Sequence, residues 1–347
     1  MLYSAPNSKR KQQILTAVVH AYIESGQPVS SRAISQRLPE ALSTASIRNT
    51  MAELEEEGFL YQPHTSAGRV PTAAGYRYFA QMVSAEATLD PEDQAWIRSE
   101  LALATTPGEV AERAGHVLAS MSRGLGIIVS PPLAKSVLEH IRFMLLPDGR
   151  VVTVLVSSGG VARDKILRPA RVFTQQDLDR TAEYLNREYV GRTLEAIRAD
   201  LLARLAHEQA RYDQLVRDAV ELCDPRLLGE NEAPQVHVEG AAQIAAATGF
   251  ADPTQLRDLL AAIEEREKLV ALLSGCIDGP EAVQVQIGVN GIDAGAGQLA
   301  LISAPYAWND QAQGSLGVLG PMRMHYERAI TTVAYVARLF NESAGRS

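Results

Sequence analysis

The chain has 347 residues, a formal net charge of −8, 46% hydrophobic residues and 21% charged residues. This length leaves room for about two to three domains, and the composition is that of a folded protein rather than a disordered one. No stretch approaches the ~18 consecutive apolar residues of a membrane helix. The two cysteines, Cys223 and Cys276, form neither a CxxC pair nor a disulfide framework. We therefore expect a cytoplasmic protein that has no membrane partner.

The charge is unevenly distributed along the chain. Up to Ala80 there are eight Lys or Arg residues against six Asp or Glu residues, a net charge of +2, which leaves −10 for the remainder. The negative total argues against nonspecific coating of nucleic acid. A basic N-terminal segment on an acidic remainder suits a DNA reader that is attached to a larger sensor or assembly module.

The N-terminal segment predicts three helices. The first covers Lys9–Glu24, has one apolar stripe and is stopped by residues 25–28. A second, short helix runs from Arg32 to Leu38, with Ser30 or Ser31 at its start and Pro39 at its end. The third begins at Ser43, a good N-cap residue, and its apolar face holds Ile47, Met51 and Leu54. Two short helices behind a longer one indicate a helix-turn-helix.

The pattern changes after Gly58. Residues 59–62 are strand-like, residues 64–69 carry a turn signal, and Val70-Pro71 resumes an extended path. A helix followed directly by a hairpin with a basic tip is typical of a winged helix-turn-helix. The alternative is an ordinary solvated helix followed by a β-hairpin.

The third helix carries side chains that suit DNA recognition. A helix in the major groove presents its N-terminal residues to base edges, where Arg48 can bind guanine and Asn49 can bind adenine. The hairpin would place its basic tip against phosphates or a minor-groove edge. Residues 9–11 are basic, and such a run is more often a solvated helix start than a contact, although this one could lie near phosphate. The candidate DNA-binding residues are Arg32, Ser43, Thr44, Ser46, Arg48, Asn49, Thr65, Ser66 and Arg69.

The rest of the chain alternates helices and strands. A helix from Thr72 leads out of the basic segment, and residues 85–91 read as a linker before two helical segments that reach Met121. Strands are predicted at 126–129, 141–146, 151–156, 236–238, 283–289, 298–304 and 315–319, with a terminal helix over 324–340. Strands separated in sequence, with helices before and after them, suggest an antiparallel α+β sheet of the sensor type.

The run from Thr193 to Leu222 predicts one long amphipathic helix, because its apolar residues recur at steps of three and four. Such an apolar stripe must pack against another apolar surface. It can pack within the chain, or it can form a subunit interface, and the stripe alone does not decide between them. The candidate interface residues are Leu194, Ile197, Leu201, Leu205, Tyr212 and Leu215.

The sequence shows no constellation that performs chemistry. The seven histidines are scattered without metal-ligand spacing. Residues 124–126 lack the rest of a dinucleotide-binding fingerprint, and no P-loop lysine is present. Residues 157–160 read as a turn rather than a nucleophile elbow. We expect no catalytic residues, no metal and no cofactor.

Four segments are distinctive as strings of residues. They are KRKQQILTAVVHAYIESGQPVSSRAI and LSTASIRNTMAELEEEGFLYQPHTSAGRVPTAAGYRYF near the N-terminus, LRDLLAAIEEREKLVALL (Leu256–Leu273), and SAPYAWNDQAQGSLGVLGPMRMHYERAITTVAYVARLF (Ser303–Phe340). These segments resemble the HrcA family of heat-inducible transcription repressors. Three details depart from the family pattern. Thr44 stands where proline is usual, Thr50 stands where glutamate is usual, and the loop at 39–42 differs. Loss of a proline at the first helical position removes some preorganisation.

The resemblance implies a multidomain α+β fold. A winged helix-turn-helix domain would cover residues 1–84, and a GAF-like domain would be split between 90–173 and 279–347 around an inserted, helix-rich dimerisation domain at 174–278. It further implies a homodimeric repressor of chaperone operons that binds an inverted-repeat operator in double-stranded DNA. The resemblance also implies inactivation by heat stress and support from the chaperonin GroEL. On that basis we favour the interface interpretation of the 193–222 stripe.

Three other functions remain open on the sequence. One is a winged-helix repressor that uses its GAF-like domain to sense a small ligand. Another is an enzyme with an accessory DNA-binding domain, which lacks a catalytic constellation. The third is a purely structural interaction protein, which leaves the cationic helix face unexplained.

Overall fold

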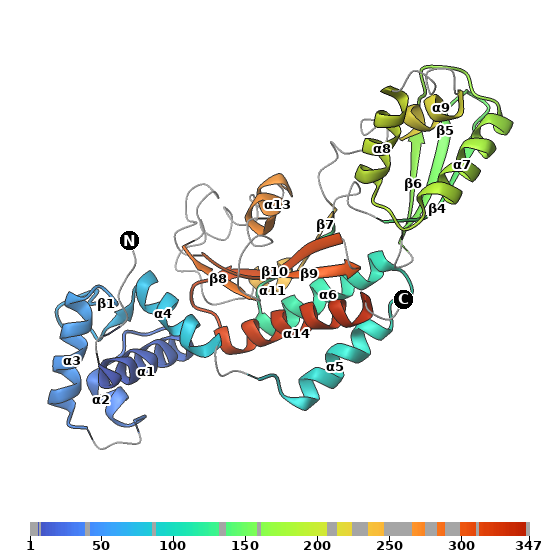
Figure 1. The fold of residues 1–347 in the computed structure, drawn as a ribbon. Helices are drawn as coiled ribbons and strands as arrows, with labels where there is room; N and C mark the ends of the chain where they lie inside the picture. The colour runs from blue at the N-terminus through green and yellow to red at the C-terminus, as the bar shows by residue number, and fades with distance from the viewer. Residues whose placement is uncertain are drawn as a thin grey trace.

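The computed structural model describes residues 6, 8–38, 42–84, 88–131, 137–157, 161–206, 214–223, 235–245, 266–274, 283–288, 299–309 and 312–344. Figure 1 shows these residues in three parts. We call residues 8–84 the head, residues 88–131 with 235–344 the body, and residues 137–223 the outer unit. Among the described residues, no helix is long and apolar enough to cross a bilayer.

The head consists of helices around a small hairpin. Its elements are α1 (Lys9–Ser25), α2 (Ser31–Ser35), α3 (Thr44–Glu56), β1 (Leu60–Tyr61), β2 (Val70–Pro71) and α4 (Ala73–Ser84). The hydroxyls of Ser8, Ser30 and Ser43 cap the first three helices by accepting hydrogen bonds from backbone N–H groups. The three predicted helices and the hairpin are therefore confirmed, although α2 ends earlier than expected.

The body is built on a five-stranded antiparallel sheet in the order β7-β3-β10-β9-β8. Its strands are β3 (Leu125–Val129), β7 (Val236–Glu239), β8 (Gln284–Ile287), β9 (Leu299–Asn309) and β10 (Ala312–Pro321). Its helices are α5 (Pro91–Ala102), α6 (Pro107–Ser122), α11 (Ala241–Ala245), α13 (Arg266–Ser274) and α14 (Tyr326–Ala344). Figure 1 shows α6 and α14 on one side of the sheet and α13 on the other.

The body sheet carries apolar side chains on both of its faces, and helices cover each face. Leu316 and Val318 of β10 belong to the core shared with α6 and α14, whereas Leu319 belongs to a second core with Leu269 and Leu273 of α13. Successive side chains of a strand point to opposite faces. An almost continuously apolar strand is what a doubly covered sheet requires.

The outer unit contains a separate three-stranded sheet in the order β4-β5-β6. Its elements are β4 (Leu138–Leu145), β5 (Val151–Ser157), β6 (Val161–Leu167), α7 (Gln175–Tyr189), α8 (Leu194–Ala206) and α9 (Gln214–Leu222). We expected the β4–β5 hairpin to share one sheet with the C-terminal strands, and this is wrong. The inner face of β4–β6 forms its own closed core with α7, α8 and α9.

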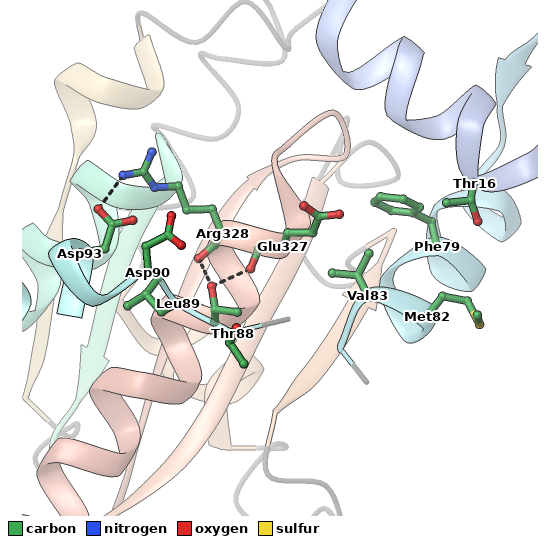
Figure 2. A pocket seen from close by; sticks show the side chains of 11 residues that line it. Thr16, Phe79, Met82, Val83, Thr88, Leu89, Asp90, Asp93, Glu327 and Arg328 are labelled. Carbon is green, nitrogen blue, oxygen red and sulfur yellow. Dashed lines mark hydrogen bonds and ion pairs between the residues drawn. The ribbon is translucent and has the colours of Figure 1, made fainter. Parts of the chain in front are cut away.

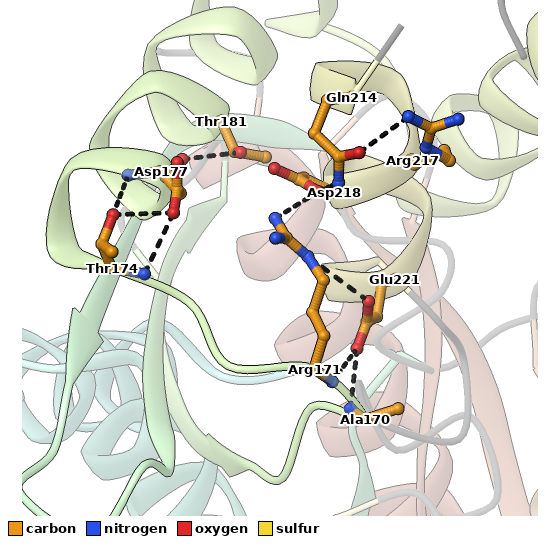
Figure 3. Close-up of polar contacts among 9 residues, drawn as sticks. All are labelled: Ala170, Arg171, Thr174, Asp177, Thr181, Gln214, Arg217, Asp218 and Glu221. Atoms are coloured by element: carbon orange, nitrogen blue, oxygen red, sulfur yellow. Dashed lines mark hydrogen bonds and ion pairs between the residues drawn. The ribbon is translucent and has the colours of Figure 1, made fainter. Parts of the chain in front are cut away.

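Polar contacts join α9 to the segment between β6 and α7. The Arg171 guanidinium pairs with the Asp218 carboxylate, and its Cζ lies 3.9 Å from the ring centre of Phe173. The Glu221 carboxylate accepts a hydrogen bond from the Ala170 N–H at 2.7 Å. Figure 3 shows Ala170 and Arg171 on one side and Asp218 and Glu221 of α9 on the other. They fix α9 against the three-stranded sheet.

The core of the head continues into the body. Tyr76 and Phe79 of α4 and Tyr326 of α14 are all buried, with ring centres 6.0 and 6.1 Å apart across the junction. His20 of α1 lies edge-on to Phe79, and its Nε2 is 3.1 Å from the Glu327 carboxylate. Head and body therefore share one hydrophobic cluster.

Candidate nucleic-acid interface

Helix α3 presents a polar face to solvent because its other face is fixed in the head core. The Ser43 hydroxyl accepts a hydrogen bond from the Ser46 N–H at 3.2 Å and so defines the start of the helix. Its inner face buries four residues, Ile47, Thr50, Met51 and Leu54. On the outer face Thr44, Arg48 and Asn49 are exposed. Arg48 and Asn49 are thus held on the accessible side near the N-terminal end of the helix, where a groove-reading helix presents its contacts.

Helix α2 packs beside α3 and adds one cation to this region. Ile34 is fully buried, whereas Arg32 is exposed. The Ser30 hydroxyl caps the helix by accepting from the Ala33 N–H at 3.2 Å. Arg32 therefore projects from a short helix of fixed orientation.

The hairpin after α3 has an ordered, exposed tip. Leu60 pairs with Pro71 and Tyr61 with Val70. Within the turn, the Gln62 side-chain amide donates hydrogen bonds to the Thr65 and Ala67 carbonyls at 3.0 and 2.8 Å. Thr65 and Ser66 are both exposed at the tip, where their hydroxyls are accessible to a phosphate oxygen.

The base of the hairpin is fastened to the segment before α2. Arg69 and Val29 exchange two backbone hydrogen bonds of 2.8 and 2.9 Å. A Cβ on Gly68 would lie 2.4 Å from the Val29 backbone, so glycine is required for this close approach. The hairpin is therefore held at a fixed position relative to α2.

The Arg69 side chain does not extend into solvent as expected. Its guanidinium lies 2.8 Å from the Glu55 carboxylate on α3, and the side chain is 16% exposed. Its Nε is buried with no hydrogen-bond partner. Arg69 thus ties the hairpin to α3 in this structure.

Four glutamates, Glu53, Glu55, Glu56 and Glu57, lie at the C-terminal end of α3, and three of them form ion pairs. Lys11 of α1 contacts Glu53 at 2.8 Å and Glu57 at 2.7 Å, while Glu55 holds Arg69. Hydrogen bonds to the two carboxylates raise the pKa of the Lys11 ammonium. Two cations against four carboxylates leave a net charge of −2 at this end of the helix, at a distance from the exposed cations near its N-terminal end.

Arg10 is not among the DNA-binding residues expected from the sequence, which predicts a solvated helix start at 9–11 that could lie near phosphate. Its guanidinium donates a hydrogen bond to the Ser46 hydroxyl at the start of α3, while the side chain remains exposed. A signal was available, because Arg10 and Lys11 lie one helical turn before the buried residues Ile14 and Leu15 and so occupy the α3-facing side of α1. Of the basic run at 9–11, the structure directs Arg10 to the N-terminal end of α3 and Lys11 to its acidic C-terminal end.

The candidate interface residues of the outer unit lie mostly inside it. Leu194, Ile197 and Leu201 are 6%, 1% and 0% exposed in a core formed by this chain itself. Leu205 and Leu215 are half-buried, and Tyr212 lies outside the described residues. Packing within the chain accounts for Leu194, Ile197, Leu201 and Leu205. The assignment of these residues to a subunit interface stays a prediction.

The described residues contain no group of three or more His, Cys, Asp or Glu side chains that could hold a metal ion. Cys223 is buried, which raises the pKa of its thiol to about 12, so it is not poised as a nucleophile. Cys276 lies outside the described residues.

A cleft of about 510 Å³ lies at the head–body junction. Phe79, Met82 and Val83 of α4 form one wall, and the opposite wall carries the ion pair between Arg328 and Asp93, whose nitrogen and oxygen are 3.2 Å apart. Figure 2 shows the apolar side chains facing this polar wall. The cleft joins head and body but lies apart from the exposed face of α3.

The fold is that of a mixed α+β multidomain protein. A solved crystal structure, described only as a hypothetical protein, shares the fold with a TM-score of 0.63 at 22% identity over 97% of this chain and 98% of its own. A family model described as the HrcA protein C-terminal domain matches residues 108–330.

Curated relatives match over nearly the full length. A heat-inducible transcription repressor HrcA from Geobacter sulfurreducens is 34% identical over 333 residues, which is 96% of each chain. One from Syntrophobacter fumaroxidans is 34% identical over 338 residues, which is 96% of this chain and 97% of its own. The chain belongs to the HrcA family, a family of transcription repressors and not of enzymes. The resemblance noted from the sequence is therefore confirmed.

Proposed function

We propose that the head is a winged helix-turn-helix that reads DNA with α3. The observation that carries this proposal is the exposure of Arg48 and Asn49 on the solvent face of a capped helix whose other face is buried. Arg48 would bind guanine and Asn49 adenine. Arg32, Ser43, Thr44, Ser46, Thr65 and Ser66 would orient the head on the sugar–phosphate backbone.

The protein acts in the cytoplasm as a homodimeric repressor of heat-shock operons that encode chaperones. Support for repression comes from the relatives that are named heat-inducible transcription repressors. Two heads related by a twofold axis match the two half-sites of an inverted repeat. A dimer bound to such an operator would block transcription.

Heat stress inactivates the repressor, and the chaperonin GroEL supports its active, folded form. The physical basis is marginal stability, because a small loss of folding free energy removes most of the active protein. The single core that runs from head to body supports this view, since unfolding of the body would disturb the head. A thermal unfolding midpoint far above any heat-shock temperature would contradict the mechanism.

We further propose how the chain divides into domains. The DNA-binding domain covers residues 1–84, and the body is the GAF-like domain in two parts. The separate sheet and core of the outer unit support an insertion that starts near residue 137, earlier than the expected residue 174, and ends after residue 223. The pairing of β7 with β3 supports a return to the body by residue 236, well before 279.

Binding to labelled duplexes tests the central proposal. The full chain is titrated onto an inverted-repeat operator and onto a scrambled duplex at two salt concentrations. We expect a preference of at least ~10³-fold for the operator and one dimer per repeat. Equal, weak and steeply salt-dependent binding to both duplexes would mean phosphate attraction alone and would overturn the proposal.

The cleft between head and body favours a second candidate, a repressor that responds to a small ligand. A ligand in this cleft would contact α4 of the head and α14 of the body together, so it could alter their relative position and thereby the affinity for DNA. A compound that shifts operator affinity, and loses its effect in a Met82→Trp variant that fills the cleft, would support this candidate.

A further inference from the structure

Helix α1 contacts α3 near one end and the body near the other. Arg10 and Lys11, in its first turn, bind side chains of α3. Farther along the helix, the His20 Nε2 lies 3.1 Å from the carboxylate of Glu327, which belongs to the first turn of α14. Gly26, the residue that ends α1, lies against the body loop that precedes α14. One helix therefore links α3 to the body.

The loop at 322–325, between β10 and α14, places a cation at the C-terminal end of α1. A Cβ built on Gly26 would overlap the guanidinium of Arg323, a half-buried side chain of this loop. Burial raises the pKa of the Tyr22 and Tyr76 phenols, and the positive charge of Arg323 opposes this rise. The guanidinium therefore lies near two tyrosines of the head as well as at the end of α1.

The end of α1 suits such a cation. The last carbonyls of a helix carry partial negative charge, and a cation beside them is favourable. α1 has no basic residue in its last turn, and that turn contains Glu24. Arg323 of the body therefore supplies the charge that the head lacks. The contact forms only when the end of α1 faces the loop at 322–325, so it selects one orientation of the head.

Two further contacts restrict rotation about this point. The first is the pair of His20 and Glu327, between α1 and α14. In the second, the Arg77 side chain of α4 donates a hydrogen bond of 3.4 Å to the Ile287 carbonyl of β8. These contacts use two helices of the head and two elements of the body. Contacts at separate points fix the orientation of a folded unit as well as its position.

The orientation of α1 matters because the helix acts as a lever. Its 17 residues make it ~25 Å long, so a tilt of ~10° at the body end moves the other end by ~4 Å. This displacement exceeds the ~3.4 Å rise of one base pair. A twofold repressor reads two half-sites at a set separation. A loose junction would therefore change the separation at which two α3 helices fit their grooves.

We propose that the head–body junction selects the spacing between the two half-sites of the operator, with Arg323 as the positioning residue. Arg323 acts through α1, from the end of the helix opposite to Arg10. Once one head is bound, binding of the second is intramolecular, and its effective concentration is highest when a stiff connection matches the span. The inference rests on the proposed homodimer and operator, and it adds a specificity determinant outside α3.

A spacing series with the full chain tests the junction. The duplexes are the inverted-repeat operator, the same repeat with one or two base pairs inserted or deleted between its half-sites, and a single half-site. We expect the wild type to lose at least ~10-fold in affinity when the spacing changes. For Arg323→Ala we expect a ~10-fold loss at the original spacing, a flattened preference and half-site affinity within ~2-fold of the wild type. Arg338→Ala is the control, because Arg338 pairs with Glu342 of its own helix.

Two glycines supply a matched pair of variants that approach the junction from the head. Gly26 and Gly58 have φ of +67° and +81°, so alanine is strained at both. A Cβ on Gly26 displaces Arg323, whereas one on Gly58 meets no atom of the described residues within 4 Å. We expect Gly26→Ala to flatten the spacing preference and Gly58→Ala to retain it. Gly26→Ala combined with Arg323→Ala should flatten it no further, because both changes remove one contact.

The outcomes separate this inference from the proposed function. A wild type that prefers the operator to a scrambled duplex but binds every spacing equally would overturn the inference alone. So would an Arg323→Ala variant that keeps the spacing preference, or one that loses affinity equally for the repeat and the single half-site, as a destabilised head would. A wild type with no preference for the operator over the scrambled duplex would overturn the proposed function itself.

Discussion

Arg69 of the hairpin and Glu55 of α3 form an ion pair of 2.8 Å that joins the two elements proposed to contact DNA. The pair lies behind the hairpin tip, and Arg69 also exchanges backbone hydrogen bonds with Val29. One residue therefore links the hairpin to α3 by its side chain and to the segment before α2 by its backbone. This arrangement makes Arg69 a positioning residue as well as a candidate phosphate contact.

The salt dependence of binding separates these two roles. Arg69→Ala removes the ion pair, so we expect weaker binding to all sequences in either role. A lost phosphate contact would lower the slope of log affinity against log salt by ~0.9, whereas a lost positioning contact leaves the slope unchanged. We expect an unchanged slope together with a lower melting temperature. Glu55→Gln is the matched control, because it frees the Arg69 side chain and leaves the Arg69 charge in place. A steeper salt dependence of binding in the Glu55→Gln variant would show that the freed Arg69 contacts phosphate.

Arg48→Ala tests base reading by α3. The side chain is exposed and belongs to no buried cluster, so its removal should leave the fold stable. We expect a loss of ~1–3 kcal/mol in operator binding and a relaxed preference at one base pair of each half-site. Glu56→Ala, at an exposed position near the far end of the same helix, is the control. Wild-type affinity in the Arg48 variant would show that α3 does not read bases as proposed.

Arg10 and Lys11 are neighbours in sequence with different expected roles. Arg10 is exposed beside Ser46 at the start of α3, so Arg10→Ala should weaken operator binding and lower the salt slope by ~0.9. Lys11 is held by Glu53 and Glu57, so Lys11→Ala should lower the melting temperature and leave the slope unchanged. The salt series and melting curves of both variants check this. Equal slopes in the two variants would remove Arg10 from the interface.

The head could be predicted closely because its signals are local. Ser43 lies immediately before an apolar stripe at helical spacing, and residues 59–71 carry strand and turn residues in order. Each of these features depends on chain neighbours alone. The ion pairs of Arg69 and Lys11 could not be predicted in the same way, because their partners are fixed only when the hairpin and α1 pack against α3.

The division between body and outer unit could not be read from the sequence. β3 pairs with β7 and β10, which follow much later in the chain, while β4 and β5 form a local hairpin between them. The apolar sequence of a strand indicates that the strand is buried, but it does not identify the strand that pairs with it. The apolar stripe at Leu194, Ile197 and Leu201 has the same limit. Its helical period indicates that the stripe is buried, but the period is the same whether the stripe packs within the chain or against a second copy.

Protonation of the Asp218 carboxyl is coupled to folding. Burial raises the pKa of its carboxyl above the ordinary value of 3.8, while Gln214 and Arg171 offset this in part and Asp177 adds to it. The folded state then binds more protons than the unfolded chain above pH 3.8. The stability that Asp218 contributes is therefore greatest below that pH and falls as the pH rises through the folded-state pKa.

Asp218→Asn removes this titration without changing the size of the side chain. We expect the unfolding free energy of the wild type to fall relative to the variant as the pH rises from 4 toward neutrality. Denaturant titrations of the full chain at several pH values measure the difference. Asp148→Asn is the control with the opposite sign, because a hydrogen bond from the Arg150 N–H lowers the pKa of Asp148, so its contribution is lost only as the pH falls. A wild type that instead gains stability over Asp218→Asn with rising pH would show that Arg171 more than offsets the burial of this carboxylate.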